Sequence, residues 1–76
     1  SVWKADTAPY RLLRLRRPRM RGDYVRWVQA RVGAVSDGIY GPGTADAVAD
    51  WQANHALVAD GIIGPMTHKS LEEGSA

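Results

Sequence analysis

Three residues in the first half of the chain have side chains and a spacing suited to binding a ligand. Tyr24, Trp27 and Arg31 fall at i, i+3 and i+7, so they share one side of a helix if this segment is helical. Aromatic rings stack on sugar rings, and a guanidinium can donate paired hydrogen bonds to a carboxylate. The pattern therefore predicts a surface that binds a glycan, a carboxylate-bearing peptide, or both.

Two candidate ligand residues also have a purely structural explanation. Trp27 could pack against the N-terminal segment, on Leu13 or Leu15, and would then be covered. Tyr40 keeps a polar hydroxyl at its tip, which suits the rim of a core as well as its interior. Both alternatives stay open at this point. The candidate ligand-binding residues are Tyr24, Trp27, Arg31 and Tyr40.

No combination of residues predicts catalysis or metal binding. The chain has no cysteine, which excludes disulfides and cysteine-ligated metals. His55, Asp60 and His68 have a spacing that matches no usual zinc pattern. We find no nucleophile paired with a base, no phosphate-binding glycine loop and no pair of carboxylates framed by a cleft. We therefore expect no catalytic residue, no metal and no cofactor.

Charge is distributed unevenly along the chain. Residues 1–31 hold nine Lys and Arg against two Asp, a net charge of +7, whereas residues 32–76 hold one Lys against six acids, a net charge of −5. Such a split indicates either a basic arm that meets an anionic partner or two halves that neutralise each other in the fold. The arginines of the arm are Arg11, Arg14, Arg16, Arg17, Arg19 and Arg21.

One loop motif occurs twice. Asp37–Thr44 reads DGIYGPGT, and Asp60–Thr67 reads DGIIGPMT, 23 residues later. Between residues 28–44 and 51–67, nine of the seventeen positions are identical. Each copy is therefore interpreted as one folding unit: a helix end, an apolar connection, an Asp-Gly turn and a Gly-Pro entry into the next helix. In the first copy the identical residues are Gln29, Ala30, Val35, Asp37, Gly38, Ile39, Gly41, Pro42 and Thr44.

The repeated residues have structural roles that residue chemistry predicts. Asp37 should accept backbone N–H groups just downstream in an Asx turn, and Gly38 should take a positive φ. Ile39 should insert into the core, Gly41 should permit a sharp entry before Pro42, and Gln29 should tie the loop backbone through its side-chain amide. The corresponding residues of the second copy are Gln52, Asp60, Gly61, Ile62, Gly64 and Pro65.

Three helices must position these loops. The first is predicted over Asp23–Val32, with Asp23 as N-cap and Gly33 as terminator. The second is predicted over Pro42–Asn54 with an inner stripe that ends at His55, and the third over Pro65–Glu72. The predicted core residues are Val25, Val28, Val32, Ile39, Val48, Trp51, Leu57, Ile62 and Leu71.

The N-terminal segment is predicted to be extended. Leu13 and Leu15 alternate with arginines, which indicates a strand-like segment with leucines inward, and Pro18 excludes a continuous helix. The fold class is all-α, a small three-helix bundle with two repeated Asp-Gly loops and an extended N-terminal arm. We expect residues 1–10 to be a linker or arm, in which Trp3 could dock, residues 11–73 the domain, and residues 74–76 a frayed end. No apolar run approaches the roughly 20 residues of a membrane span, and the start at Ser1 leads us to expect a fragment of a longer protein.

With these motifs the sequence resembles the peptidoglycan-binding domain family, the three-helix module of cell-wall hydrolases and phage endolysins. The resemblance covers about residues 13–71 and includes the lead-in LRRPRMRGDYV. Two departures are Ala56, where a Gly is common, and Trp27, where a small or polar residue is common. The residues that carry the resemblance are Val28-Gln29, Asp37-Gly38-Ile39-Tyr40-Gly41, Thr44, Ala47-Val48, Trp51-Gln52 and Asp60-Gly61-Ile62-Ile63-Gly64-Pro65-Met66-Thr67.

The resemblance implies a non-catalytic module that anchors an attached wall-degrading enzyme to peptidoglycan. The expected partners are then a glycan or stem peptide, anionic wall polymers through the arginine arm, and the attached catalytic domain. The expected location is the bacterial cell wall or the extracellular space, with synthesis in the host cytoplasm if the source is a phage endolysin. The alternatives are a nucleic-acid-binding domain that uses the arginine arm and a module that binds another protein, such as a cap on a hydrolase.

Overall fold

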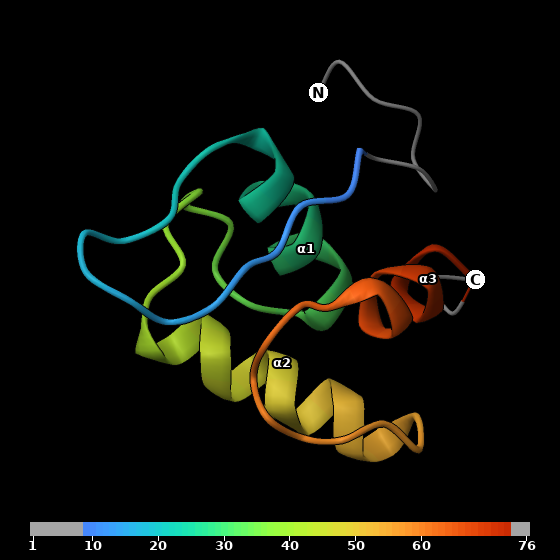
Figure 1. Cartoon of the computed structure of the whole chain (residues 1–76). Coiled ribbons are helices and arrows are strands. Elements are labelled where there is room, and N and C mark those ends of the chain that lie inside the picture. The colour runs from blue at the N-terminus through green and yellow to red at the C-terminus, as the bar shows by residue number, and fades with distance from the viewer. Residues whose placement is uncertain (1–8, 74–76) are drawn as a thin grey trace.

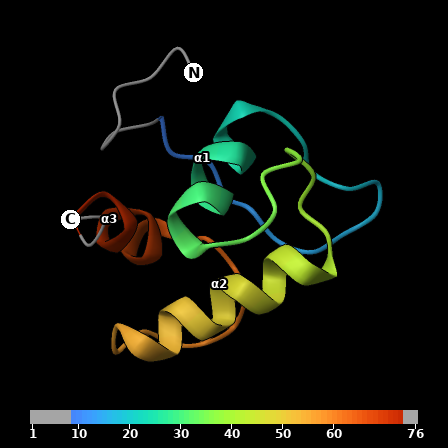
Figure 2. The same cartoon turned by 180° about the vertical axis from the view of Figure 1, so that it is seen from behind.

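The computed structural model describes residues 9–73, and this part of the chain folds into three helices with no strand. They are α1 (Asp23–Val32), α2 (Pro42–Asn54) and α3 (Pro65–Glu73), and Figure 1 shows their arrangement. Both α1 and α3 lie on the same side of α2, as the view from behind also shows (Figure 2). The all-α three-helix prediction is confirmed. Of the linker predicted over residues 1–10, only Pro9 and Tyr10 are described, and both are exposed. Residues 1–8, the docking of Trp3 and fraying after residue 73 lie outside the described residues.

The start of α1 differs in one detail from the prediction. Gly22, with φ 132°, is the N-cap, and Asp23 is the first helical residue and makes no side-chain cap hydrogen bond. Asp23 still places a negative charge in the first turn, where the helix dipole favours it. The helix ends as predicted, because Gly33 takes the left-handed conformation with φ 80°.

The end of α2 repeats the end of α1 with a residue less suited to it. In both helices a glutamine carbonyl accepts an N–H from beyond the helix: Ala34 N donates to Gln29 O at 2.9 Å, and Leu57 N donates to Gln52 O at 3.0 Å. The left-handed residue is Gly33 in the first case and Ala56, with φ 58°, in the second. Ala56 therefore carries a steric cost that Gly33 avoids.

The segment before α1 is extended and ties both loops together by backbone hydrogen bonds. Leu13 and Ile63 exchange two bonds, of 3.3 and 2.8 Å, in an isolated antiparallel bridge. Tyr40 N donates to Met20 O at 2.9 Å. Residues 9–22 thus cross the molecule past both Asp-Gly loops (Figure 1), with a cis peptide bond before Pro18. The extended N-terminal arm is confirmed.

The inward side chains of the arm are not the pair that was predicted. Leu13 is fully buried, as expected, but Leu15 is 43% exposed, and Met20 is the second residue of the arm that enters the core. The segment bends at Leu15 and again at residues 17–18, so the alternation of an extended strand does not continue from Leu13 to Met20.

The core lies between the arm, the three helices and the second half of each loop. The predicted core residues Val25, Val28, Val48 and Leu71 are buried, whereas Val32, Trp51 and Leu57 are only partly buried. His55 was predicted on the inner stripe but is exposed, with its ring stacked on Trp51 at 3.7 Å between centroids. The buried apolar set is Leu13, Met20, Tyr24, Val25, Trp27, Val28, Tyr40, Val48, Ile63 and Leu71.

Each loop buries the residue after the predicted isoleucine. Ile39 is half-buried and Ile62 is 36% exposed, whereas Tyr40 and Ile63 are fully buried. Successive side chains of an extended segment point to opposite faces, so a shift by one residue exchanges the buried and exposed sets. The arm sets this register, because it accepts the N–H groups of Tyr40 and Ile63.

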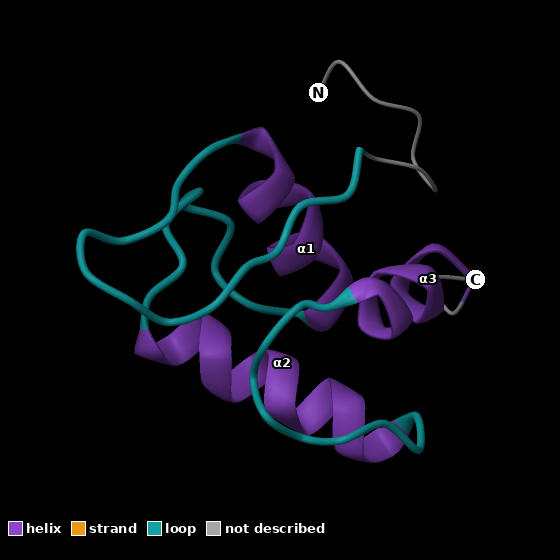
Figure 3. Cartoon of the chain, in the orientation of Figure 1, coloured by secondary structure: helices purple, strands orange, loops and turns teal. Residues whose placement is uncertain are grey.

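Loops and turns make up much of the domain, as Figure 3 shows, since the helices contain only 10, 13 and 9 residues. No helix within residues 9–73 has the length and apolar character that a membrane span requires. The domain must therefore satisfy long stretches of loop backbone without strand pairing.

Replacing Ala56 by glycine should stabilise the domain. The substitution removes the steric cost of a left-handed alanine, partly offset by the larger entropy of glycine in the unfolded chain. We expect A56G to raise the free energy of unfolding by about 0.5–1 kcal/mol, measured by urea denaturation. As a control, A53G in the exposed interior of α2 should lower it by a similar amount. A destabilising A56G would contradict the proposed cost.

Candidate ligand-binding groove

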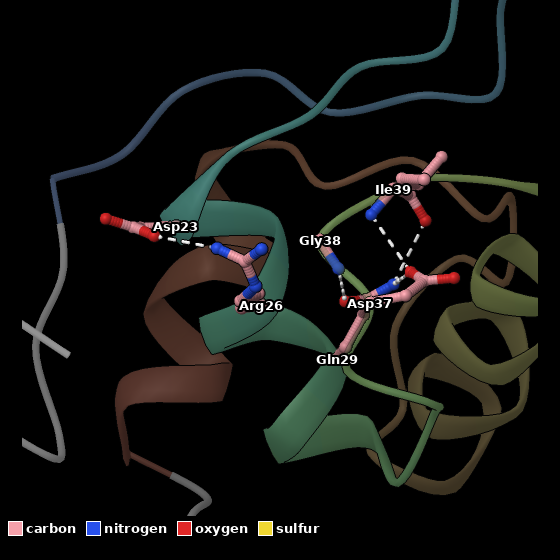
Figure 4. A network of polar contacts seen from close by, with 6 residues as sticks. All are labelled: Asp23, Arg26, Gln29, Asp37, Gly38 and Ile39. Carbon is pink, nitrogen blue, oxygen red and sulfur yellow. Dashed lines mark hydrogen bonds and ion pairs between the residues drawn. The ribbon is translucent and has the colours of Figure 1, made fainter.

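The first loop is held by one buried glutamine side chain. Gln29 Nε2 donates to Asp37 Oδ1 at 2.9 Å and to Ile39 O at 3.0 Å, and it lies 2.9 Å from Thr44 Oγ1. Gln29 Oε1 accepts the backbone N–H of Gly38 at 2.9 Å. Most of this network is drawn in Figure 4. The prediction that the glutamine ties the loop backbone through its amide is confirmed.

The second loop repeats the network with the same atoms. Gln52 Nε2 donates to Asp60 Oδ1 at 3.2 Å and Ile62 O at 2.9 Å, and it lies 3.0 Å from Thr67 Oγ1. Gln52 Oε1 accepts from Gly61 N at 2.9 Å. The two copies therefore adopt one backbone design, as the sequence repeat predicts.

The aspartate and the first glycine of each loop also behave as predicted. Asp37 Oδ1 accepts the Ile39 N–H at 2.9 Å, and Asp60 Oδ1 accepts the Ile62 N–H at 2.9 Å, so both form Asx turns. Gly38 has φ 76° and Gly61 has φ 71°, the left-handed region in which glycine is favoured.

Asp37 is held in its charged form. Its side-chain oxygen accepts hydrogen bonds from the backbone of Ile39 and from the amide of Gln29, and these lower the pKa of the Asp37 carboxyl. The nearby Arg26 guanidinium lowers it further. Both of these hydrogen bonds use Oδ1, so Asp37 Oδ2 keeps its acceptor capacity within the described part of the chain.

The second glycine of each loop does not have the predicted role. Gly41 is extended, with φ −102° and ψ −174°, a conformation that any residue adopts. A Cβ atom built on Gly41 or on Gly64 would meet nothing within 4 Å. The entry into α2 and α3 therefore requires no glycine, and the prediction of a structural need at these positions is wrong.

The predicted exposed aromatic side of α1 is covered by α3. Tyr24 is 4% exposed and Trp27 is 8% exposed. The Tyr24 hydroxyl forms a 2.7 Å hydrogen bond with His68 Nδ1, and the Trp27 ring lies 5.6 Å from the His68 ring. Arg31 is half-buried, stacks on Trp27 at 4.4 Å and donates to the Leu71 carbonyl at 3.3 Å. Of the two interpretations of Trp27 that the sequence left open, the structure agrees with the covered one.

Tyr40, the fourth candidate, joins the two loops instead of facing a ligand. It is fully buried, and its hydroxyl donates to the Gly61 carbonyl at 2.5 Å. Burial raises the pKa of the Tyr40 hydroxyl, so it remains a donor at all physiological pH values. Of the rim and interior positions that the sequence left open for Tyr40, the structure shows the interior, because pairing with the arm turns this side chain inward.

A groove of about 500 Å³ opens beside the first loop, within the size range of small-ligand sites. It lies between the end of α1, the loop and the start of α2. Its lining is small and mostly apolar, with Asp37 as the charged member. The lining residues are Gly33, Ala34, Val35, Asp37, Ile39, Gly41, Pro42, Gly43, Thr44 and Ala47.

The groove was not predicted, although the repeat contains a signal for it. Val35 is repeated as Val58, yet the two are 81% and 79% exposed, so neither is retained for the core. Gly41 is repeated as Gly64 without a conformational need. In the first copy both Val35 and Gly41 line the groove.

The basic arm remains unpaired with acids. Within residues 9–73 the Lys or Arg ion pair is Arg26 with Asp23, at 3.1 Å on an exposed surface, and no arm arginine joins a carboxylate. Among the described residues, the guanidinium groups of the arm donate one hydrogen bond, from Arg19 to the Arg16 carbonyl at 3.1 Å. The described residues also contain no cluster of His, Asp and Glu that could hold a metal ion.

Comparison with known protein families gives one match. The family model described as "Putative peptidoglycan binding domain" matches residues 21–71, which include both loops and every residue that lines the groove. Neither the curated proteins nor the solved structures contain a significant match.

Replacing Gln29 by leucine should destabilise the domain strongly. The variant leaves the Gly38 N–H without its buried acceptor and removes the amide donor from the Asp37 carboxylate and the Ile39 carbonyl. Each unsatisfied group costs about 1–3 kcal/mol, so we expect Q29L to lower the free energy of unfolding by about 2–3 kcal/mol in urea denaturation. S36A, at an exposed loop position, is the control and should change it by less than about 0.5 kcal/mol. An unchanged Q29L would show that the amide is not what holds the loop.

Proposed function

Since the chain belongs to the peptidoglycan-binding domain family, we propose that it is a non-catalytic module that anchors an attached wall-degrading enzyme to its substrate. The domain acts at the bacterial cell wall, and its source is a bacterial wall hydrolase or a phage endolysin. In an endolysin it would be made in the host cytoplasm and act at the wall. The observation that carries the proposal is the family match over residues 21–71.

The geometry supports a binding role because the groove is preformed. Both loops are rigidly held by buried amides, so the groove beside the first loop is formed before any ligand arrives. A preformed site loses little entropy on binding. A tethered binding module also raises the local concentration of its enzyme at the wall, because the second binding event becomes intramolecular.

The 76-residue chain itself should sediment with purified peptidoglycan sacculi. We expect most of the protein in the pellet at micromolar concentration, and A56G, which leaves the groove intact, should sediment equally. A basic protein of similar size and no wall affinity controls for charge. Absence from the pellet with sacculi of several species, including different stem-peptide types, would refute the proposed function.

The arginine arm supports a second contact, with anionic wall polymers. Its six arginines make no ion pair with a carboxylate in the described part of the chain, so their charge is available to a polyanion. Nucleic acid is the alternative polyanion. Against it, α2 and α3 carry Asp46, Asp50, Glu72 and Glu73, so neither helix is suited to enter a groove of DNA.

Two binding assays distinguish anionic wall polymers from nucleic acid as the partner of the arm. We expect sedimentation with walls that retain their teichoic acids to exceed sedimentation with walls stripped of them, and the difference to disappear in the triple variant R14Q/R16Q/R17Q. In a gel shift near 150 mM salt we expect no complex with duplex DNA or single-stranded RNA. A tight complex there, weakening steeply with added salt, would favour the nucleic-acid alternative.

A further inference from the structure

We propose that the groove binds the stem peptide of peptidoglycan, with a peptide amine against Asp37, and does not bind the glycan strand. This inference rests on the proposed function and names the part of the polymer that the site takes. Its basis is the composition of the lining, the free oxygen of one carboxylate and the difference between the two copies of the repeat.

The lining lacks the side chains that bind sugars. None of the ten lining residues is aromatic, and none is Asn, Gln, Lys or Arg. Glycan sites depend on ring stacking and on several side-chain donors and acceptors around each sugar. Of the two lining residues with a polar side chain, Thr44 is 6% exposed and uses its hydroxyl within the loop network. A sugar would therefore find few partners here.

The same lining suits a short peptide rich in alanine. Gly33, Gly41 and Gly43 have no side chain, so a peptide backbone can approach the surface closely. Val35 and Ile39 offer apolar contacts for methyl groups. Stem peptides contain alanine, D-glutamate and a diamino acid, and the second amine of the diamino acid is free wherever the peptide is not cross-linked.

Asp37 supplies the charge that such an amine requires. It is the only ionisable residue of the lining, and both of its loop hydrogen bonds use Oδ1. Figure 4 shows the other oxygen directed away from the network. Arg26 lies against Gly38 and lowers the pKa of Asp37, but its guanidinium is paired with Asp23 at 3.1 Å and does not line the groove. An ammonium group in the groove could form a charge-assisted hydrogen bond with Asp37 Oδ2.

The second copy of the repeat provides an internal comparison. Its backbone and glutamine network are the same, but larger side chains stand at the positions of the groove: Leu57 for Ala34, and Met66 for Gly43. Asp60 holds the same Asx turn as Asp37. The structural scaffold is therefore present twice, whereas the small-residue lining belongs to the first copy.

The first test compares three soluble probes by chemical-shift titration of the whole chain. The probes are the stem tetrapeptide L-Ala-γ-D-Glu-L-Lys-D-Ala, the same peptide with its lysine amine acetylated, and chitotetraose. We expect the free peptide to shift the amides of Ala34, Val35 and Gly43, the acetylated peptide to bind at least fivefold more weakly, and chitotetraose to leave these amides unchanged. Equal binding of both peptides would overturn the role of the amine, and chitotetraose in the groove would overturn the proposal.

Matched variants separate the groove from the fold. Asparagine retains an Oδ1 acceptor for the Asx turn, so D37N and D60N remove one charge from equivalent turns. We expect D37N to weaken the tetrapeptide about fivefold, in line with an exposed ion pair, and D60N to have no effect. Equal effects of the two variants would show that the charge acts at long range, which would overturn a local contact.

A double variant transfers the lining of the second copy into the first. A34L/G43M should abolish tetrapeptide binding while the thermal midpoint stays within a few degrees, because a Cβ on Gly43 meets nothing within 4 Å. M66A in the second copy is the control and should bind as the native chain does. If the native chain sediments with sacculi and A34L/G43M sediments equally, this inference fails and the proposed function stands. If the native chain does not sediment, the proposed function fails.

Discussion

The structure depends on two buried glutamine side chains that satisfy loop backbone. About half of the described chain is loop, and in so small a domain these loops cannot lie far from the core. Gln29 and Gln52 each supply an amide that donates to a carbonyl and a carbonyl that accepts a glycine N–H. Each glutamine side chain thereby replaces the partners that a strand would offer, and it fixes the path of the loop around it.

The same scaffold leaves two loops with different surfaces. The hydrogen bonds around Gln29 and Gln52 agree within a few tenths of an ångström, so backbone geometry does not distinguish the copies. What differs is side-chain volume at positions that the networks do not use, such as Gly43 and Met66. A duplicated unit can therefore preserve its fold through a few polar residues while one copy keeps an open groove. The family match covers both copies, which agrees with a fold that requires the pair.

The aromatic residues of α1 illustrate how packing competes with ligand binding. Tyr24 and Trp27 are covered by α3 through His68, and Arg31 stacks on Trp27 while it donates to the end of α3. Trp27 Nε1 and Arg31 Nε are buried without a hydrogen-bond partner in the described part of the chain. The gain from ring packing and the cation–π contact must outweigh that loss. Tyr24, Trp27 and Arg31, whose side chains would suit a sugar-binding site, instead form the contact between α1 and α3.

Local chemistry in the sequence determined the helices, the Asx turns, the left-handed glycines and the roles of Gln29 and Gln52, because each depends on residues close along the chain or on the repeat itself. The family resemblance rested on the same residues. Tertiary structure alone decided three other features. The arm determined that Tyr40 and not Ile39 is buried. Alternate side chains of an extended segment point to opposite faces, and pairing with the arm decides which set faces the core. The position of α3 decided that Tyr24 and Trp27 are covered, because a helix side is exposed only if nothing packs on it. The groove, finally, is the volume left where small residues from two helices and a loop meet, and no single segment of sequence encodes that volume.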